Sequence, residues 1–483
     1  MVKVSYNIKN RVKYTIYILF FSRYFISISI GRSVKLMKKN FFNTAKSAVE
    51  IAVEAGVNMA EAYLVTSKSL YIEVHDGKVE TMKLAEDRGV GLRLIHEGKM
   101  GFAFSTELTL DGIKKLVSEA QSNTKSAQSD SYNNLPDPVN SYSSLELFDK
   151  DIQTVPVEGK IDMAFAMERV AKKHDKRIKI IENAIYQDGE SEVLIINSKG
   201  VSANYRSTYF GMYLTLVASD GRDNQTGFAL DYSLKYKNLN PEKIGRLAAD
   251  RAVRMLGAKP IQSKRLPVVL DSYVAASFLG MLGSALTADS VQKGKSLFVN
   301  KMGEVVAADC VTIIDDGTLS SGIASAPFDG EGVPTSKTIL IKDGRLENYL
   351  YNTYTALKDG VHSTGNSVRT SFKSTPETGL TNFYLEPGEM SFDSLIKDIS
   401  YGLFVTEVMG MHTANPISGD FSLGASGILI ENGEITKPVR GVAIAGNIAE
   451  ILKSIEALAN DLKFYGNKGA PSVRISEMSI SGA

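Results

Sequence analysis

The stretch from residue 44 to residue 120 alternates between apolar and polar positions and predicts a strand-rich region. A helical repeat of apolar residues over Thr44–Ala55 comes first, and Gly56 ends it. Alternating runs typical of half-buried strands follow, namely Glu61–Ser67, Leu70–His75, Lys78–Lys83, Gly89–Ile95 and Met100–Phe104. The pairs Asp76-Gly77 and Glu97-Gly98 favour tight turns between them. We expect antiparallel hairpins, closed by a helix over Leu110–Ala120.

The segment 121–144 interrupts this pattern. It is rich in Ser, Asn, Asp, Gln and Pro and has no apolar period, so we predict a linker. Beyond it, helices are expected over Ile161–Lys173 and from Asn240 to Gly257, where Asn240-Pro241 is typical of a helix start. Strand-like runs lie between these helices, at Arg177–Tyr186, Glu192–Ser198, Ala203–Ser219 and Arg222–Asp231.

The last part of the chain is mostly strand and turn. Leu266–Leu270 predicts a strand, Asp271 caps a helix from Ser272 to about Leu286, and a final helix is expected over Ile448–Leu462. Asp343-Gly344 and Asn432-Gly433 predict further hairpins.

The predicted fold class is therefore α+β, with an α/β N-terminal region followed by a β-rich, mainly antiparallel C-terminal domain. The expected divisions are an extension over 1–43, an N-terminal α/β domain over 44–120, the linker over 121–144, a middle α+β region over 145–262 and the C-terminal domain over 263–483.

Composition places the chain among globular proteins. Hydrophobic residues make up 43% and charged residues 23%, which excludes collagen-like, coiled-coil and disordered classes. The net charge of +1 gives no reason to expect a nucleic-acid partner. Residues 1–39 hold nine Lys/Arg and no acid, leaving 46 basic against 54 acidic residues elsewhere. This mildly acidic body is typical of a cytoplasmic protein.

The basic N-terminal segment surrounds an apolar run, Tyr14–Ile30. Arg23 divides that run into pieces too short to span about 30 Å of hydrocarbon. We interpret residues 1–36 as an extension or a mis-assigned start, with Met37 opening the globular chain. A membrane anchor or a signal is the alternative, although no A-x-A cleavage site follows.

Few residues could carry chemistry. The single cysteine, Cys310, excludes an intramolecular disulfide, and we interpret it as a small apolar residue at the start of a buried strand. His362 and His412 lie in loops of small and polar residues, where a metal site with Cys310 or a carboxylate is the alternative to ordinary hydrogen bonding. Asp329 and Glu331 are interpreted as part of a backbone-shaping turn, with a hydrolytic carboxylate pair as the alternative. No phosphate-binding loop motif is present.

A series of short runs occurs in an order that resembles the TldD/PmbA family of metallopeptidase-related proteins. The runs are Pro327–Val333, Ser363–Asn366, Thr381–Gly388, Ser418–Ser422, Ile430–Ile435, Ile444–Asn447 and Ala459–Leu462. Glu61–Thr106 is similar to the first domain of the same family, so the resemblance covers the chain from about residue 44 to its end. It implies a two-part chain with a β-rich C-terminal domain.

The family has two branches, and the resemblance implies the one without a metal site. TldD-type subunits carry an H-E-x-x-x-H helix and a distant cysteine that bind a catalytic metal, whereas PmbA-type (TldE) subunits lack them and pair with a TldD-type subunit. Alignment on neighbouring runs puts Leu279, Gly280 and Ser284 at the His, Glu and His positions. The cysteine position falls in Tyr465–Gly469, which has none. We therefore expect no cofactor in this chain and zinc in a TldD-type partner.

The resemblance implies a subunit of a heteromeric metallopeptidase that acts on unfolded peptides and forms a homodimer when alone. Exposed strand edges could hold an extended peptide by strand addition. The candidate peptide groove comprises Phe328, Asp329, Gly330, Glu331, Gly332, Ser363, Thr364, Gly365 and Asn366.

Two alternatives stay open. One is an active hydrolase with a rewired site built from His362, His412, Cys310 or Asp329. The other is a peptide-binding or scaffold protein without a peptidase partner. Nucleic acid is not an expected partner in any of these readings, and membrane association is not expected.

Overall fold

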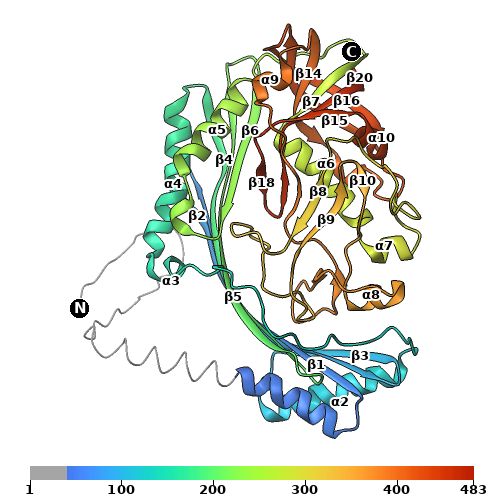
Figure 1. The fold of residues 1–483 in the computed structure, drawn as a ribbon. Coiled ribbons are helices and arrows are strands. Elements are labelled where there is room, and N and C mark those ends of the chain that lie inside the picture. The colour runs from blue at the N-terminus through green and yellow to red at the C-terminus, as the bar shows by residue number, and fades with distance from the viewer. Residues whose placement is uncertain (1–40, 483) are drawn as a thin grey trace, which may run out of the picture.

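The computed structural model describes residues 41–482 and contains three six-stranded sheets (Figure 1). The apolar run Tyr14–Ile30 and the proposed start at Met37 lie outside the described residues. The fold is α+β, as the sequence predicts, with helices against the first sheet and a β-rich C-terminal part.

The first sheet is antiparallel throughout and has the strand order β3-β2-β1-β4-β5-β6. Its strands are β1 (Met59–His75), β2 (Lys78–His96), β3 (Lys99–Ser105), β4 (Ile178–Asn197), β5 (Ser202–Ser219) and β6 (Asn224–Ser233). Pairs of predicted short runs merge here into single long strands. Because β1 pairs with β4, this one sheet joins the N-terminal and middle parts of the chain.

Four helices cover one face of this sheet. The helix over 41–54 and α2 (Leu110–Ser126) pack on one end, while α4 (Val157–His174) and α5 (Pro241–Val253) pack on the other (Figure 1). Even-numbered residues of β1, from Ala60 to Val74, contribute to both helical cores. Side chains alternate between the faces of a strand. The odd-numbered face, with Tyr63, therefore turns toward Phe328 and the C-terminal part.

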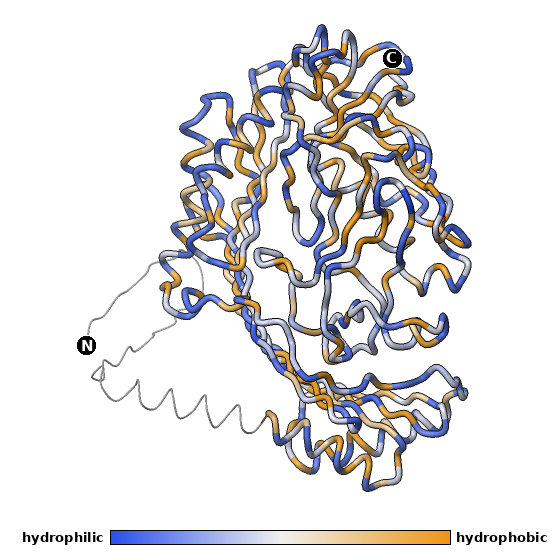
Figure 2. Tube along the Cα trace, viewed as in Figure 1, coloured by the Kyte–Doolittle hydropathy of each residue, from blue (hydrophilic) through white to orange (hydrophobic). Residues whose placement is uncertain are grey.

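The C-terminal part packs α6 (Ser272–Ala285) with two sheets around the largest core. The second sheet, in order β16-β15-β14-β7-β20-β17, comprises β7 (Lys264–Leu270), β14 (Tyr401–Met409), β15 (Asp420–Glu431), β16 (Glu434–Asn447), β17 (Ile455–Leu458) and β20 (Val473–Ser481). The third, in order β10-β9-β8-β13-β19-β18, comprises β8 (Ile313–Asp316), β9 (Lys337–Lys342), β10 (Arg345–Leu346), β13 (Phe383–Leu385), β18 (Lys463–Tyr465) and β19 (Lys468–Ala470). Apolar residues are concentrated along the strands and between α6 and the two sheets (Figure 2).

Short elements complete the fold. They are α3 (Asp151–Thr154), α7 (Ala288–Gln292), α8 (Thr353–Asp359), α9 (Phe392–Ile396), α10 (Ile448–Lys453) and the strand pair β11 (Ser367–Val368) and β12 (Glu377–Thr378). Within residues 41–482, no helix has both the length and the apolar character needed to cross a membrane.

Local signals placed most turns and helix starts correctly. Asp76, Glu97, Asp343 and Asn432 all adopt positive φ at the predicted hairpin turns, each followed by a glycine. The Asn240 side chain accepts a hydrogen bond from the Lys243 N–H at 2.8 Å and caps α5. Such turn and cap chemistry depends only on neighbouring residues.

Two helix ends differ most from the prediction. The helix expected over Ile448–Leu462 is wrong, because it ends at Lys453 and gives way to β17, which pairs with β20 near the end of the chain. The second difference is that α2 continues to Ser126, into the segment predicted as a linker. Thr124 is buried against β3 there, and its hydroxyl donates to the Ala120 carbonyl at 2.8 Å.

Candidate functional site

A cavity of about 1050 Å³ opens where the first sheet meets the C-terminal part. Its wall is drawn from segments far apart in the sequence. They are α6 and α7, the start of α8, the extended segment 375–380, the loop 127–134 after α2, Arg93 on β2 and Lys468 on β19. The cavity therefore lies between parts of the chain that the sequence analysis assigns to different domains.

One wall of the cavity is the face of α6 that carries Gly280, Gly283 and Ser284. Residues three and four positions apart lie on the same side of a helix. Leu279 does not line the cavity and is buried in the core, with 5% of its surface exposed. Of the three positions aligned with the family's metal motif, two face the cavity and Leu279 does not.

Lys468 lies directly against Gly280. A Cβ atom at position 280 would stand 3.1 Å from the Lys468 Nζ and Cδ atoms. The hairpin β18–β19 thus brings Tyr465–Gly469, aligned with the family's distant cysteine, beside the helix aligned with its other ligands. The Tyr465 and Ser272 hydroxyls, 2.8 Å apart, join the hairpin to the start of α6. Among residues 41–482, no hydrogen bond or ion pair reaches the Lys468 ammonium.

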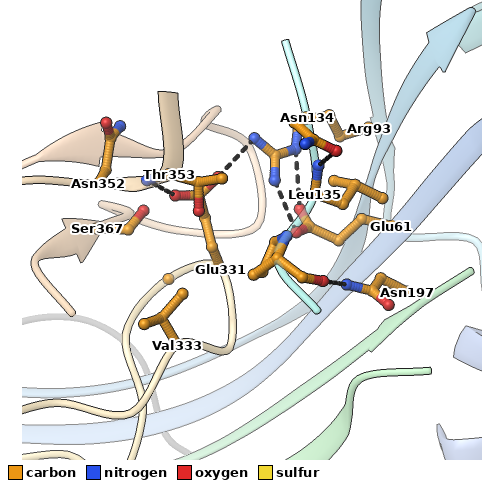
Figure 3. Close-up of polar contacts among 12 residues, drawn as sticks. Glu61, Arg93, Asn134, Leu135, Asn197, Glu331, Val333, Asn352, Thr353 and Ser367 are labelled. Atoms are coloured by element: carbon orange, nitrogen blue, oxygen red, sulfur yellow. Dashed lines mark hydrogen bonds and ion pairs between the residues drawn. The ribbon is translucent and has the colours of Figure 1, made fainter. Parts of the chain in front are cut away.

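Arg93 forms the inner wall of the cavity and is the centre of a buried ion network (Figure 3). Its guanidinium donates to both carboxylate oxygens of Glu61, at 3.1 and 2.8 Å, and to Glu331 at 2.9 Å. The second Glu331 oxygen accepts from the Thr353 N–H at 3.0 Å. Arg369 binds Glu61 from the C-terminal part and lies over the ring of Tyr63. The network joins the first sheet to the C-terminal part.

The predicted groove residues Phe328–Gly332 are buried. The Asp329 carboxylate accepts from the N–H groups of Glu331, Val333 and Ser367 at 2.9, 3.0 and 2.9 Å. Burial, and then the neighbouring Glu331 charge, raise the pKa of Asp329 above its ordinary 3.8. Carboxylates held in this way shape the backbone, which agrees with the interpretation of this turn.

The other predicted groove residues, Ser363–Asn366, form a hydrogen-bonded loop behind the cavity wall. The Thr364 hydroxyl donates to the Asn366 side-chain oxygen at 2.7 Å, and the Asn366 amide donates to Asp315 at 2.7 Å. Burial raises the pKa of Asp315 to about 6. The Gly379 N–H donates to the Asn366 carbonyl at 2.9 Å. The loop therefore supports the extended segment 375–380 that lines the cavity.

The residues of the rewired-site alternative do not gather as metal ligands. His362 is exposed in a loop and His412 is exposed in the short 3₁₀ helix Met411–Thr413, so the two lie in separate segments. Cys310 is also exposed, so its interpretation as part of a buried strand is wrong; β8 begins only at Ile313. In the part of the chain that the structure describes, no three His, Cys, Asp or Glu side chains form a group that could hold a metal ion.

Comparison with known protein families covers most of the described chain. Three domain profiles match in order: PmbA/TldA metallopeptidase domain 1 over residues 60–124, the central domain over 150–256 and the C-terminal domain over 263–482. The chain belongs to the PmbA/TldD metallopeptidase family.

The similarity to relatives in this family extends over nearly the full length of those proteins. The metalloprotease PmbA of Escherichia coli O157:H7 is 28% identical, covering 95% of this chain and 99% of that protein. A metalloprotease of Methanothermobacter thermautotrophicus is 30% identical, covering 89% and 97%. A metalloprotease TldD homolog of Haemophilus influenzae is 28% identical, covering 91% and 96%. Both branch names thus occur among relatives of similar identity.

Two solved structures share the fold. A putative modulator of a DNA gyrase from Thermotoga maritima has a TM-score of 0.85 and 29% identity, covering 91% of this chain and all of that one. TldE from Thermococcus kodakarensis has the same TM-score at 22% identity, covering 91% of this chain and all of that one, and supports the fold alone.

Sequence reasoning in this PmbA/TldD family member missed Arg93, Glu61 and Lys468. Arg93 and Glu61 lie on alternating strands, where charged residues usually face solvent. One signal was available, because Arg93 interrupts the apolar run Leu92–Ile95 and Glu61 directly precedes the apolar run Ala62–Val65. The position of Lys468 against Gly280 depends on a contact that no local pattern encodes.

Proposed function

We propose that this chain is the non-catalytic, PmbA-type (TldE-type) subunit of a heteromeric metallopeptidase that acts on unfolded peptides in the cytoplasm. A TldD-type partner would hold the zinc ion and supply the hydrolytic chemistry. This chain would contribute the fold, the interface and part of the space in which a peptide is held.

The observation that carries the proposal is the composition of the cavity wall around α6. Zinc takes imidazole, thiolate and carboxylate ligands. At the positions aligned with the family's metal-binding residues, this chain offers the backbone of Gly280, the hydroxyl of Ser284 and the ammonium of Lys468. These groups do not fit a zinc ion, because a glycine has no donor side chain and an ammonium repels a cation. No hydrolytic step is therefore assigned to this chain.

The cavity itself supports a peptide-binding role. Ligand pockets in proteins commonly occupy about 300–1,000 Å³, and this one is about 1050 Å³. One wall is the extended segment 375–380, of which Glu377 and Thr378 form β12. Extended backbone beside a cavity is the kind of surface that accepts an added peptide strand.

The test combines purification and activity. The chain and a TldD-type paralogue would be purified separately and together, and each sample assayed on an unfolded protein with and without a chelator. We expect co-purification, activity in the mixture that the chelator abolishes, and no activity from this chain alone. A partner whose H-E-x-x-x-H motif is replaced by alanines is the matched control and should leave the mixture inactive.

Each alternative gives a different result in the same assay. Chelator-sensitive cleavage by this chain alone would overturn the proposal in favour of a rewired hydrolase. Failure to co-purify, together with unchanged partner activity, would overturn it in favour of a binding or scaffold protein. Size measurement of the lone chain reports separately on the proposed homodimer.

A further inference from the structure

The charged groups of the cavity are mostly neutralised by neighbours. Arg93 is bound by Glu61 and Glu331, as described above. On α7, Asp289 and Lys293 form an ion pair of 2.8 Å. Across the cavity, Asp130 accepts a hydrogen bond from the Tyr354 hydroxyl at 2.8 Å. These groups have their charges or lone pairs satisfied within the protein.

Lys468 is the exception among the cations that line the cavity in the described chain. Its ammonium has neither a hydrogen bond nor an ion pair, although the side chain is half-buried against α6. Its backbone is fixed, because β19 pairs with β18 on one side and with β13 on the other. A partly buried ammonium has lost some of its hydration, and without a partner nothing in the protein offsets that loss. An anionic ligand would offset it by forming an ion pair.

A second unpartnered polar group lies on the same wall. Ser284 is one helical turn from Gly280, lines the cavity and is exposed, and no residue in 41–482 forms a hydrogen bond with its hydroxyl. The ammonium lies against Gly280 and the hydroxyl is one helical turn further along the same wall, so the two groups could each donate to one oxygen of a carboxylate. We propose that Lys468 and Ser284 bind the C-terminal carboxylate of a short peptide in this cavity.

This inference deepens the proposed function, since it rests on the cavity being a peptide-binding space. It is nevertheless testable on this chain alone. Glu377 is the other charged lining residue without a partner in the described chain, but it is exposed on β12 rather than held against α6. Glu377→Gln therefore serves as a matched control that removes one charge from the same cavity.

The experiment measures binding of three alanine-rich peptides to the full chain by calorimetry. One peptide has a free C-terminal carboxylate, the second is its C-terminal amide, and the third is the amide with one internal Glu. We expect the free acid to bind at least about ten-fold more tightly than either amide. Lys468→Met should remove that preference, Lys468→Arg should largely keep it, and Ser284→Ala should reduce it.

Each other result overturns the inference. Equal binding of the free acid and the amide, or no binding of either, would show that the cavity does not select a carboxylate. Equal binding of the internal-Glu amide would overturn the C-terminal assignment. A gain in free-acid binding in Glu377→Gln as large as the loss in Lys468→Met would show a general charge effect. Thermal melting of each variant confirms folding, and the mixing assay judges the subunit role independently.

Discussion

Arg93 and Glu331 lie 238 positions apart in the chain and meet in a buried ion pair of 2.9 Å. Arg93 is 4% exposed and Glu331 is 1% exposed. Glu331 also accepts a hydrogen bond from the Thr353 N–H, and Arg93 also donates hydrogen bonds to Glu61. Because each charge has its partners, the junction between the first sheet and the C-terminal part depends on the whole network rather than on one contact.

Replacing Arg93 by methionine should destabilise the protein strongly. Two carboxylates, Glu61 and Glu331, would stay buried without their shared cation, and breaking a buried pair costs about 3–5 kcal/mol. The check is the free energy of unfolding from urea titration. The control is Arg265→Met, which breaks an exposed pair with Glu477 and should cost at most about 1 kcal/mol. Equal losses in both variants would contradict the prediction.

Two glycines of α6 should respond in opposite directions to alanine. A Cβ at Gly283 would stand 2.4 Å from the Leu380 side chain, so Gly283→Ala should cost about 1–3 kcal/mol through overpacking. At Gly280 the neighbour is the flexible end of Lys468, which can move aside. Gly280→Ala should therefore be neutral or stabilising by up to about 1 kcal/mol, the usual helix preference for alanine. The check is the urea midpoint of unfolding of each variant, measured side by side. A similar loss of stability in both variants would contradict the prediction.

Asp315 should make stability depend on pH. Its carboxylate accepts from Asn366 and Thr381 in the interior, and burial raises its pKa from 3.8 to about 6. The folded state then binds the proton more tightly than the unfolded state. The contribution of Asp315 is therefore present below about pH 4 and is lost as the pH rises to about 6.

Asp315→Asn removes this titration at a cost that does not itself vary with pH. The difference in unfolding free energy between wild type and variant should thus be larger near pH 4 than above pH 6, as measured by denaturant titration across that range. Asp309→Asn, at an exposed position, is the control. A difference that grew with pH would show that the sign is wrong.

Restoring the family's motif on α6 should not create a zinc site. Leu279 faces the core, so Leu279→His would bury an imidazole away from the cavity, while Gly280→Glu would meet the Lys468 side chain. The triple variant with Ser284→His should hold no stoichiometric zinc and should melt below the wild type. Metal analysis after dialysis measures the zinc. About one tightly held ion per chain would contradict the prediction.

Local chemistry explains what the sequence predicts well. Asp76-Gly77 and Asn432-Gly433 form tight turns because those residues tolerate positive φ, whatever lies elsewhere. The segment Ile455–Leu458 resembles a helix by its apolar spacing, yet it pairs with β20. Its strand conformation depends on a distant partner, which a local pattern does not contain.

The candidate site was harder to predict for the same reason. Gly280 and Ser284 could be located by family alignment, but their relation to Lys468 requires the β18–β19 hairpin to fold back on α6. The sequence predicts a turn at Asp329 and Glu331, while their burial depends on Arg93 and on the first sheet. Long-range contacts decide both features.

The pairing of β1 with β4 has a consequence for synthesis on the ribosome. Strands β1 and β2 can form a hairpin as soon as they emerge, but β1 must wait for Ile178–Asn197 before its other edge is covered. During that interval the nascent chain presents an open strand edge, which is prone to pair with other chains. Slow translation between residues 105 and 178 would prolong this exposure. The yield of folded protein in the cell should therefore depend on translation speed and on chaperones that shield strand edges.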